Sequence, residues 1–210
     1  MTEYHKIETI FERDTEGSKK LIPGKYRNET IEFLKDNEWV FTEKIDGTNI
    51  RVHWDGHKVE FGGRTDRAQI PAKLVSYLNN TFGGDASEEL FEQKFGENDV
   101  ILFGEGYGPG IQKGGGLYRN DVSFILFDVM IGNTYLKRDG VEDIAKAFGI
   151  DVVPIVGTGT LEEGVSFVRA EPVSTIGTAM MEGVVARPKV EMKDRMGRRV
   201  IVKIKVKDFA

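Results

Sequence analysis

The chain has 210 residues, a net charge of −5 and no cysteine. This length suits one large domain or two small ones with a sizeable core. The lack of cysteine excludes disulfides, thiolate zinc sites and cysteine nucleophiles, and three histidines argue against a multi-histidine metal site. No apolar run approaches the roughly 20 residues that span a bilayer, and the polar N-terminus lacks a signal-peptide pattern. We therefore expect a cytoplasmic protein without a membrane partner.

Positive charge is concentrated near the C-terminus. Residues Arg187 to Lys207 include nine Lys or Arg and two acids, whereas the whole chain carries −5. Local basic patches, more than net charge, determine the affinity of a protein for phosphates. The segment predicts either a contact with nucleic acid or a solvated charged hairpin, and its charge alone favours neither.

The first half of the chain shows mainly strand signals. Apolar residues at helical spacing predict helices at 28–36 and 68–82. Apolar or alternating runs predict the strands Trp39–Lys44, Ile50–Trp54, Lys58–Phe61 and Val100–Phe103. Asp55-Gly56 joins two of these runs and is a strong signal for a β-hairpin.

The second half mixes strands with two capped helices. Asp139 is expected to cap a helix that ends at Gly149. The segment from Thr160 to Glu163 has the capping-box spacing for a helix that runs to about Arg169. Further strands are predicted at Ser123–Met130, Val152–Val156, Val184–Arg187 and Arg199–Val206.

The order of these elements indicates the fold class. Strands do not alternate regularly with helices and hairpins recur, which favours an α+β fold with antiparallel sheets flanked by helices. No internal repeat or linker is present, so we expect one domain over residues 1–210. The glycine-rich segment Gly104–Gly116 predicts neither helix nor strand. We interpret it as a flexible loop, with a loop that covers phosphates as the alternative.

The clearest chemical motif lies in residues 41–49. Lys44 stands where one predicted strand ends and another begins, and Gly47 lets backbone approach a ligand. Taken alone, Asp46-Gly47 also fits a surface turn. The run Lys44-Ile-Asp-Gly47, however, resembles the K-x-D-G signature of the covalent nucleotidyltransferases, which include DNA ligases, RNA ligases and mRNA-capping enzymes.

Further motifs that resemble those of this superfamily follow in the expected order. They are Gly63-Arg64-Thr65, Phe103-Gly-Glu105-Gly, Phe124-Ile-Leu-Phe127-Asp128, Met181-Glu182-Gly-Val-Val185 and Val202-Lys203-Ile-Lys205. The extended run from Glu43 to Asn49 is most similar to RNA ligases that seal nicks in duplex RNA, found in phages and in trypanosome RNA editing. K-x-D-G alone arises often by chance, whereas ordered motifs across residues 43–205 are a specific signal.

The resemblance implies an ATP-dependent RNA ligase with a nucleotidyltransferase (ATP-grasp-like) adenylation domain. Such an enzyme joins 3′-hydroxyl and 5′-phosphate ends through a lysyl-AMP intermediate and an adenylylated 5′ end. The resemblance implies ATP as AMP donor, Mg²⁺ or Mn²⁺ as metal, and nucleic acid as partner: RNA, with DNA or hybrid nicks as alternatives. It also implies a monomer that repairs RNA in a phage- or bacterium-like setting. An amine nucleophile must be neutral, and nearby cations and desolvation favour that form.

The resemblance also assigns roles to individual residues. The catalytic residues are Lys44, Lys203 and Lys205. The nucleotide contacts are Glu43, Ile45, Arg64, Glu105, Phe127 and Glu182, with Glu105 on the ribose, Phe127 stacked on adenine and Glu182 holding the metal. The polynucleotide contacts are Asn49, Arg64, Arg198 and Arg199. Asp46 has no assigned role, because related RNA ligases often have histidine there.

Strand alternation separates the aromatic candidates near residue 127. Phe127 and Ile125 are expected on one face of their strand, and Phe124 and Leu126 on the other. The resemblance assigns Phe127 to the adenine. This leaves Phe124 and Leu126 for the core.

The last motif ends at Lys205, five residues before the end of the chain. We therefore expect this chain to contain neither the OB domain of DNA ligases and capping enzymes nor the helical domain of nick-sealing RNA ligases. A minimal ligase and a catalytic domain cut from a longer protein both fit. A DNA ligase, an mRNA-capping guanylyltransferase and a non-catalytic nucleic-acid-binding homologue remain alternatives, because these motifs do not reveal the sugar of the substrate.

Overall fold

The computed structural model describes residues 1–210, which form two compact units. The first unit contains Met1–His5 and Asp46–Val153, and the second contains Lys6–Ile45 and Pro154–Ala210. The chain therefore passes from one unit to the other inside the lysine motif. The expected single domain stays a prediction, because two such units are compatible with one domain or with two.

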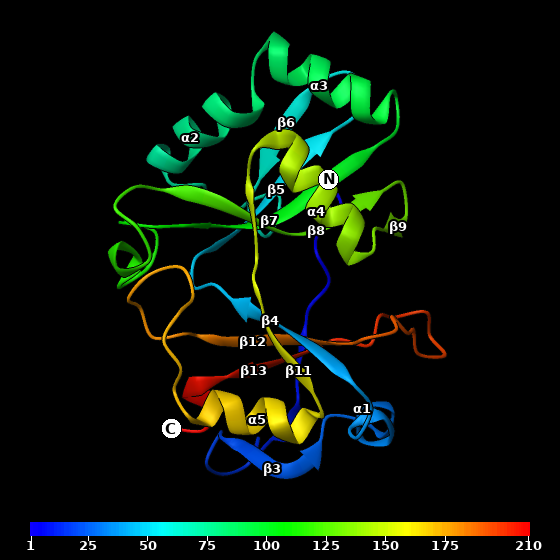
Figure 1. Ribbon diagram of the computed structural model, residues 1–210, viewed down its shortest axis with the longest axis vertical. Helices are drawn as coiled ribbons and strands as arrows, with labels where there is room; N and C mark the ends of the chain where they lie inside the picture. Colours follow the sequence, from blue (N-terminus) through cyan, green and yellow to red (C-terminus); the bar gives the residue numbers. More distant parts are fainter. The chain divides into compact units, whose positions relative to one another are not determined.

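The first unit is built on a six-stranded sheet with one face covered by helices (Figure 1). Its strands are β5 (Thr48–Trp54), β6 (Val59–Gly62), β7 (Val100–Tyr107), β8 (Ser123–Ile131), β9 (Thr134–Tyr135) and β10 (Asp151–Val152). Its helices are α2 (Ala72–Phe82), α3 (Asp85–Phe95), the 3₁₀ turn η1 (Gly115–Leu117) and α4 (Arg138–Phe148). The main path of the sheet is β10-β8-β7-β5-β6, with β9 beside β8. Only β10 pairs in parallel.

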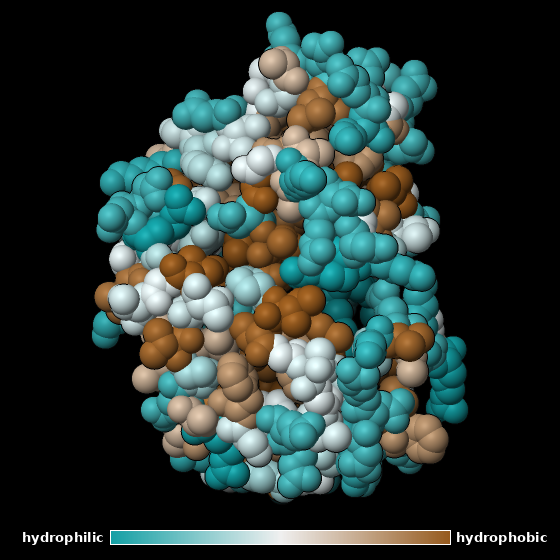
Figure 2. Space-filling model, viewed as in Figure 1, coloured by the Kyte–Doolittle hydropathy of each residue, from teal (hydrophilic) through white to brown (hydrophobic).

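The core of the first unit lies between its sheet and its helices. Leu78 of α2, Phe91 of α3 and Val141 of α4 are buried together with Val52 of β5 and Phe124 of β8. The outer side of the region around α2 and α3, at the top of the view, is mainly hydrophilic (Figure 2). One face of this sheet is therefore committed to the core under the helices. The strand residues at alternate positions, which include the buried Ile101, Phe103 and Met130, lie on the other face.

The second unit repeats this plan with a five-stranded sheet in the order β1-β13-β12-β4-β11. Its strands are β1 (Glu8–Thr9), β2 (Phe11–Arg13), β3 (Leu21–Tyr26), β4 (Trp39–Lys44), β11 (Ile155–Gly159), β12 (Gly183–Pro188) and β13 (Val202–Lys205). Its helices are α1 (Glu29–Leu34), α5 (Leu161–Arg169) and the 3₁₀ turn η2 (Val206–Asp208). Strands β2 and β3 form a separate hairpin. The fold is thus α+β with mainly antiparallel sheets, as predicted.

A second core holds this unit together. Ile31 of α1, Val168 of α5 and Leu21 of the β2–β3 hairpin pack against Phe41 and Val184 on one face of the sheet. None of the helices in either unit has the length and apolar composition needed to cross a membrane.

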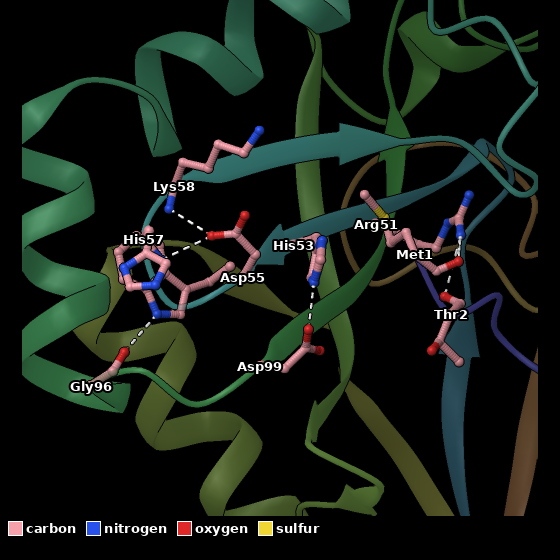
Figure 3. A network of polar contacts seen from close by, with 10 residues as sticks. Met1, Thr2, Arg51, His53, Asp55, His57, Lys58, Gly96 and Asp99 are labelled. Carbon is pink, nitrogen blue, oxygen red and sulfur yellow. Dashed lines mark hydrogen bonds and ion pairs between the residues drawn. The ribbon is translucent and has the colours of Figure 1, made fainter.

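Several local predictions are confirmed. Thr160 accepts a hydrogen bond from the Glu163 N–H while Glu163 reaches back to the Thr160 N–H, which is the predicted capping box at the start of α5. The Asp55-Gly56 pair turns β5 into β6, and Gly56 has a φ of +97° that favours glycine. The Asp55 carboxylate also accepts the N–H groups of His57 and Lys58 (Figure 3). This hairpin is therefore determined by its own sequence.

Other local predictions were wrong. Residues Val152–Val156 do not form one strand, because β10 ends before Val153 and β11 starts at Ile155, in the other unit. Asp139 does not cap α4: Lys137 is the N-cap residue, and the Asp139 carboxylate accepts only the neighbouring Gly140 N–H. The strand predicted at Arg199–Val206 is shorter, since β13 spans only Val202–Lys205. Helix α3 was not predicted, because only Phe91 and Phe95 of its residues are buried and its apolar pattern is weak. The end of α4 at Gly149 is confirmed.

The prediction that Gly104–Gly116 contains no strand was also wrong, since β7 continues to Tyr107. The glycines of β7 make room for large neighbours. A Cβ at Gly104 would overlap the Phe124 ring and the Ile125 carbonyl oxygen, and a Cβ at Gly106 would overlap Leu74. These glycines serve core packing in a central strand, which local composition does not show.

We expect Gly104→Ala to destabilise the protein by roughly 1–3 kcal/mol, because the added methyl group overpacks the core. Urea denaturation measures the change in the free energy of unfolding. Gly116→Ala is the matched control, because the nearest atom to its Cβ would lie 3.9 Å away. Equal stability of the two variants would show that the fit at Gly104 is looser than described.

Candidate active site

Strand β12 pairs with β4 on one side and with β13 on the other. Gly183 lies opposite Lys44 in β4 and opposite Lys205 in β13, and Val185 lies opposite Lys203. Directly paired residues share a face of a sheet, and so do alternate residues of one strand. The three lysines predicted to be catalytic therefore lie on one face, which we call the lysine face. Two strand spacings separate the backbones of Lys44 and Lys205, about 10 Å.

Gly183 keeps the centre of the lysine face free of side chains. A Cβ at this position would overlap the Ile204 carbonyl oxygen and approach the Lys205 Cα atom. The glycine after Glu182 is therefore required by the close pairing of β12 with β13. Because glycine has no side chain, Gly183 leaves the space between Lys44 and Lys205 to the side chains of these two residues.

An ion pair occupies the lysine face. Lys44 Nζ donates a hydrogen bond to Glu182 Oε2 at 2.7 Å, and the two side chains are 26% and 18% exposed. Burial lowers the pKa of Lys205, the charge of Lys207 lowers it further, and Glu182 and Asp208 oppose the shift. The lysine face thus gathers several cations around one carboxylate.

Glu182 also meets the requirements for a weakly held divalent metal. No cluster of three or more His, Cys, Asp or Glu side chains is arranged as a metal site. Mg²⁺ commonly binds through one or two carboxylates and completes its shell with water and substrate phosphates. The Glu182 carboxylate is partly exposed and already binds the Lys44 ammonium. A single-carboxylate site of this kind therefore fits the residues present.

Glu43 points away from the lysine face. It alternates with Lys44 along β4 and is only 1% exposed. Its carboxylate accepts hydrogen bonds from the Ser174 and Thr175 hydroxyls and, at 3.0 Å, from the Thr175 N–H. The carboxylate therefore fastens the 174–175 loop beneath the strand that carries Lys44. Ile45, the other predicted nucleotide contact here, is 3% exposed.

In the first unit, the face of the sheet opposite the helices carries the predicted residues Asn49, Glu105 and Phe127. Asn49 of β5, Glu105 of β7 and Ile125 of β8 lie directly opposite one another in one row. The Asn49 Oδ1 atom is buried and has no hydrogen-bond partner. A buried acceptor without a donor is costly, so this atom is suited to a donor from a ligand.

Phe127 lies on the same side as this row, as predicted. Phe124 and Leu126 belong to the core under the helices, whereas Phe127 packs with Phe103 on the other face. Phe103 pairs with Asp128 and Gly104 pairs with Leu126, which makes Phe127 the extra residue of a β-bulge. Bulges re-aim side chains at functional positions. Phe127 is partly exposed there.

Two residues that sequence reasoning missed hold the second half of the lysine motif. The Asp46 N–H donates to the Tyr118 hydroxyl at 3.2 Å, and Gln112 Nε2 donates to the Gly47 carbonyl at 3.1 Å. A Cβ at Gly47 would overlap the Gly106 carbonyl oxygen. The glycine-rich segment Gly104–Gly116 thus packs on the lysine motif. The only sequence signal for this contact was the position of the segment between two of the motifs.

The predicted polynucleotide contacts differ in exposure. Arg64 is exposed on the loop after β6. The Arg198 side chain is 73% exposed and bonded to Asp194, whereas the Arg199 side chain is 6% exposed and bonded to Glu191. Arg198 is therefore the more accessible of the two arginines.

The two mainly antiparallel sheets, one with the lysine face and one with Asn49, Glu105 and Phe127, belong to an α+β fold of the nucleotidyltransferase type. The RNA ligase family model matches residues 37–205, so the chain belongs to the RNA ligase family. This match extends over both units.

Solved structures show the same fold. The chain is similar to Naegleria gruberi RNA ligase: an apo variant has a TM-score of 0.68 at 18% identity over 100% of this chain and 56% of that one. A variant with ATP and Mn has a TM-score of 0.69 and 18% identity, and the match covers 100% of this chain and 57% of that one. A variant with AMP and Mn has a TM-score of 0.65 and 18% identity, and the match covers 97% of this chain and 62% of that one. The chain thus spans just over half the length of these proteins.

The buried Glu43 carboxylate leads to a prediction about stability. Glu43→Ala should cost about 2–3 kcal/mol, because it leaves the Ser174 and Thr175 donors without their charged acceptor. Glu38→Ala is the control: that carboxylate is exposed and binds Lys189, and such surface pairs contribute about 0–1 kcal/mol. Thermal and urea unfolding measure both. Similar small losses would mean that Glu43 does not anchor the 174–175 loop.

Proposed function

We propose that this chain is the adenylyltransferase domain of an ATP-dependent RNA ligase and that Lys44 carries AMP. The observation that supports this most directly is the lysine face, where Lys44 of the K-x-D-G motif lies with Lys203, Lys205 and Glu182 on one side of a sheet. These residues all lie within residues 37–205, the range that the RNA ligase family model matches, and this supports the proposal. The ATP and manganese of the similar Naegleria gruberi structures support the choice of nucleotide and metal.

In the first step, the neutral amine of Lys44 attacks the α-phosphorus of ATP. A P–N bond forms, the α–β phosphoanhydride bond breaks, and pyrophosphate leaves with the released electron pair. Lys203 and Lys205 lie on the same face as the nucleophile. Their charges stabilise the negative charge that develops on the phosphate.

Glu182 would hold Mg²⁺ or Mn²⁺ together with the ATP phosphates, and the ion supplies charge neutralisation at the reacting phosphate. In the free protein, Glu182 binds the Lys44 ammonium at 2.7 Å. This contact keeps the nucleophile in place before ATP arrives.

The first unit would contact the nucleoside and the polynucleotide. Glu105 binds the ribose, Phe127 stacks on the adenine, and Asn49 and Arg64 orient the activated 5′-phosphate. Stacking of a base on an aromatic ring contributes roughly 1–3 kcal/mol, and guanidinium suits phosphate. In the later steps AMP passes to the 5′-phosphate, and a 3′-hydroxyl then displaces AMP to form the phosphodiester.

RNA is the proposed substrate, nicked RNA duplexes in particular, with Arg198 as a phosphate contact outside the reacting groups. Phage origin and a role in RNA repair follow only from the sequence resemblance and stay proposals, as do a monomeric state and a cytoplasmic location. Sealing assays on nicks with ribose or deoxyribose at the 3′-hydroxyl end distinguish RNA from DNA ligation. Faster sealing of all-DNA nicks would contradict the RNA assignment.

We expect the protein to gain the mass of one AMP on incubation with ATP and Mg²⁺, and Lys44→Ala to abolish this gain. Lys205→Ala should slow it by at least about tenfold, because it removes a charge near the reacting phosphate. Lys146→Ala, on the exposed side of α4, is the control. Intact-mass spectrometry follows the reaction. Adenylylation of Lys44→Ala would contradict the assignment of the nucleophile, and labelling by GTP instead of ATP would favour a capping enzyme.

We expect Asn49→Ala and Arg64→Ala to form enzyme-AMP but to seal pre-adenylylated nicks at least about tenfold more slowly, since one lost charge-assisted contact costs 1.5–3 kcal/mol. Arg67→Ala is the matched control, because Arg67 is exposed on the same loop. Single-turnover assays measure the two steps separately. Equal losses in both steps would show that Asn49 and Arg64 act on the fold and not on the 5′-phosphate.

A further inference from the structure

Arg51 is a buried charge with no part in the proposed chemistry. It lies in β5 two residues after Asn49 and is 0% exposed. Its Nε atom donates to the Gly63 carbonyl at 2.7 Å, and its Nη2 atom donates to Asp66 Oδ1 at 2.9 Å. Its Nη1 atom donates to the carbonyls of Met1, at 2.8 Å, and Thr2, at 3.3 Å (Figure 3). A buried guanidinium is tolerated only when its donors are satisfied in this way.

The first group of partners surrounds Arg64. Gly63 comes directly before Arg64, and Asp66 follows two residues later. Arg64 itself is exposed, on a segment outside any helix or strand. Arg51 therefore contacts the chain on both sides of the arginine proposed to bind the 5′-phosphate, through the Gly63 carbonyl before it and the Asp66 side chain after it.

The second group of partners belongs to the N-terminal segment. Two residues beyond Thr2, the Tyr4 hydroxyl donates to Asp128 Oδ2 at 2.8 Å. The Tyr4 ring lies edge-on to Phe127, with centroids 5.0 Å apart. Arg51 thus anchors the start of a segment that packs on the residue proposed to stack on adenine.

We propose that Arg51 is a positioning residue that fixes Arg64 and, through Met1–Tyr4, Phe127. The inference rests on the proposed function. The Arg51 guanidinium binds both the 63–66 loop and the N-terminal segment. The proposed phosphate contact of Arg64 and the proposed base contact of Phe127 therefore both depend on Arg51. Lysine does not replace it, because an ammonium group lacks the rigid fork that reaches acceptors in several directions.

The first test compares Arg51→Lys with Arg64→Ala and with the double variant in single-turnover sealing of pre-adenylylated nicked RNA. We expect Arg51→Lys to slow this sealing by about tenfold and, in a separate enzyme-adenylylation assay, to raise the KM for ATP. If Arg51 acts through Arg64, the double variant should be no more than about twofold slower than the slower single variant, because coupled residues are not additive. Losses that multiply, or normal sealing by Arg51→Lys, would overturn the proposal.

The second test does not depend on ligase activity. Trypsin should cut after Arg64 and Arg67 at least about threefold faster in Arg51→Lys and in Asp66→Ala, because local opening exposes the loop. Cleavage after Arg195, an exposed residue in the other unit, should be unchanged and is the control for a general change in susceptibility to trypsin. Asp66→Ala removes one contact of a side chain that is 66% exposed, so it keeps the test valid if Arg51→Lys does not fold. Unchanged cleavage after Arg64 would overturn the anchoring role. A wild-type protein that neither adenylylates nor seals would refute the proposed function, while the trypsin result would still test the anchor.

Discussion

Strand β12 hydrogen-bonds to β4 along one edge and to β13 along the other, and the position of the candidate nucleophile depends on this double pairing. The register places Gly183 between Lys44 and Lys205. If β4 or β13 shifted its pairing register by one residue, its lysines would move to the opposite face of the sheet, where Phe41 and Val184 are buried. The apolar core on one side of the sheet therefore fixes the cationic side chains on the other.

A face that gathers lysines costs electrostatic free energy before any ligand is bound. The only acidic side chain that makes an ion pair with Lys44 is Glu182. Burial lowers the pKa of Lys205 because a half-buried ammonium is poorly hydrated. The core under the sheet supports this unfavourable arrangement. The same positive potential that opposes folding is complementary to a polyphosphate.

In each unit, a buried acidic or basic side chain holds a loop near a proposed functional residue. In the second unit Glu43 fastens the 174–175 loop from the covered side of β4. In the first unit Arg51 fastens the 63–66 loop and the N-terminal segment. Both are adjacent or nearly adjacent to residues assigned to substrate. Such supporting contacts hold functional side chains in one geometry. They explain why Glu43 stands directly before Lys44 although its side chain points away from the lysine face.

The sequence by itself determined the local elements and the family. β4, the Asp55-Gly56 hairpin and the α5 capping box were predicted because their signals lie within a few neighbouring residues. The ordered motifs indicated the lysines and Glu182 as candidates for the same reason. Only the tertiary structure showed that β7 continues through its glycines, that the chain changes units between Val153 and Pro154, and that Arg51 and Tyr118 support the motifs. These features arise from contacts between residues far apart in the sequence, where the available space and the hydrogen-bond partners are set by other strands.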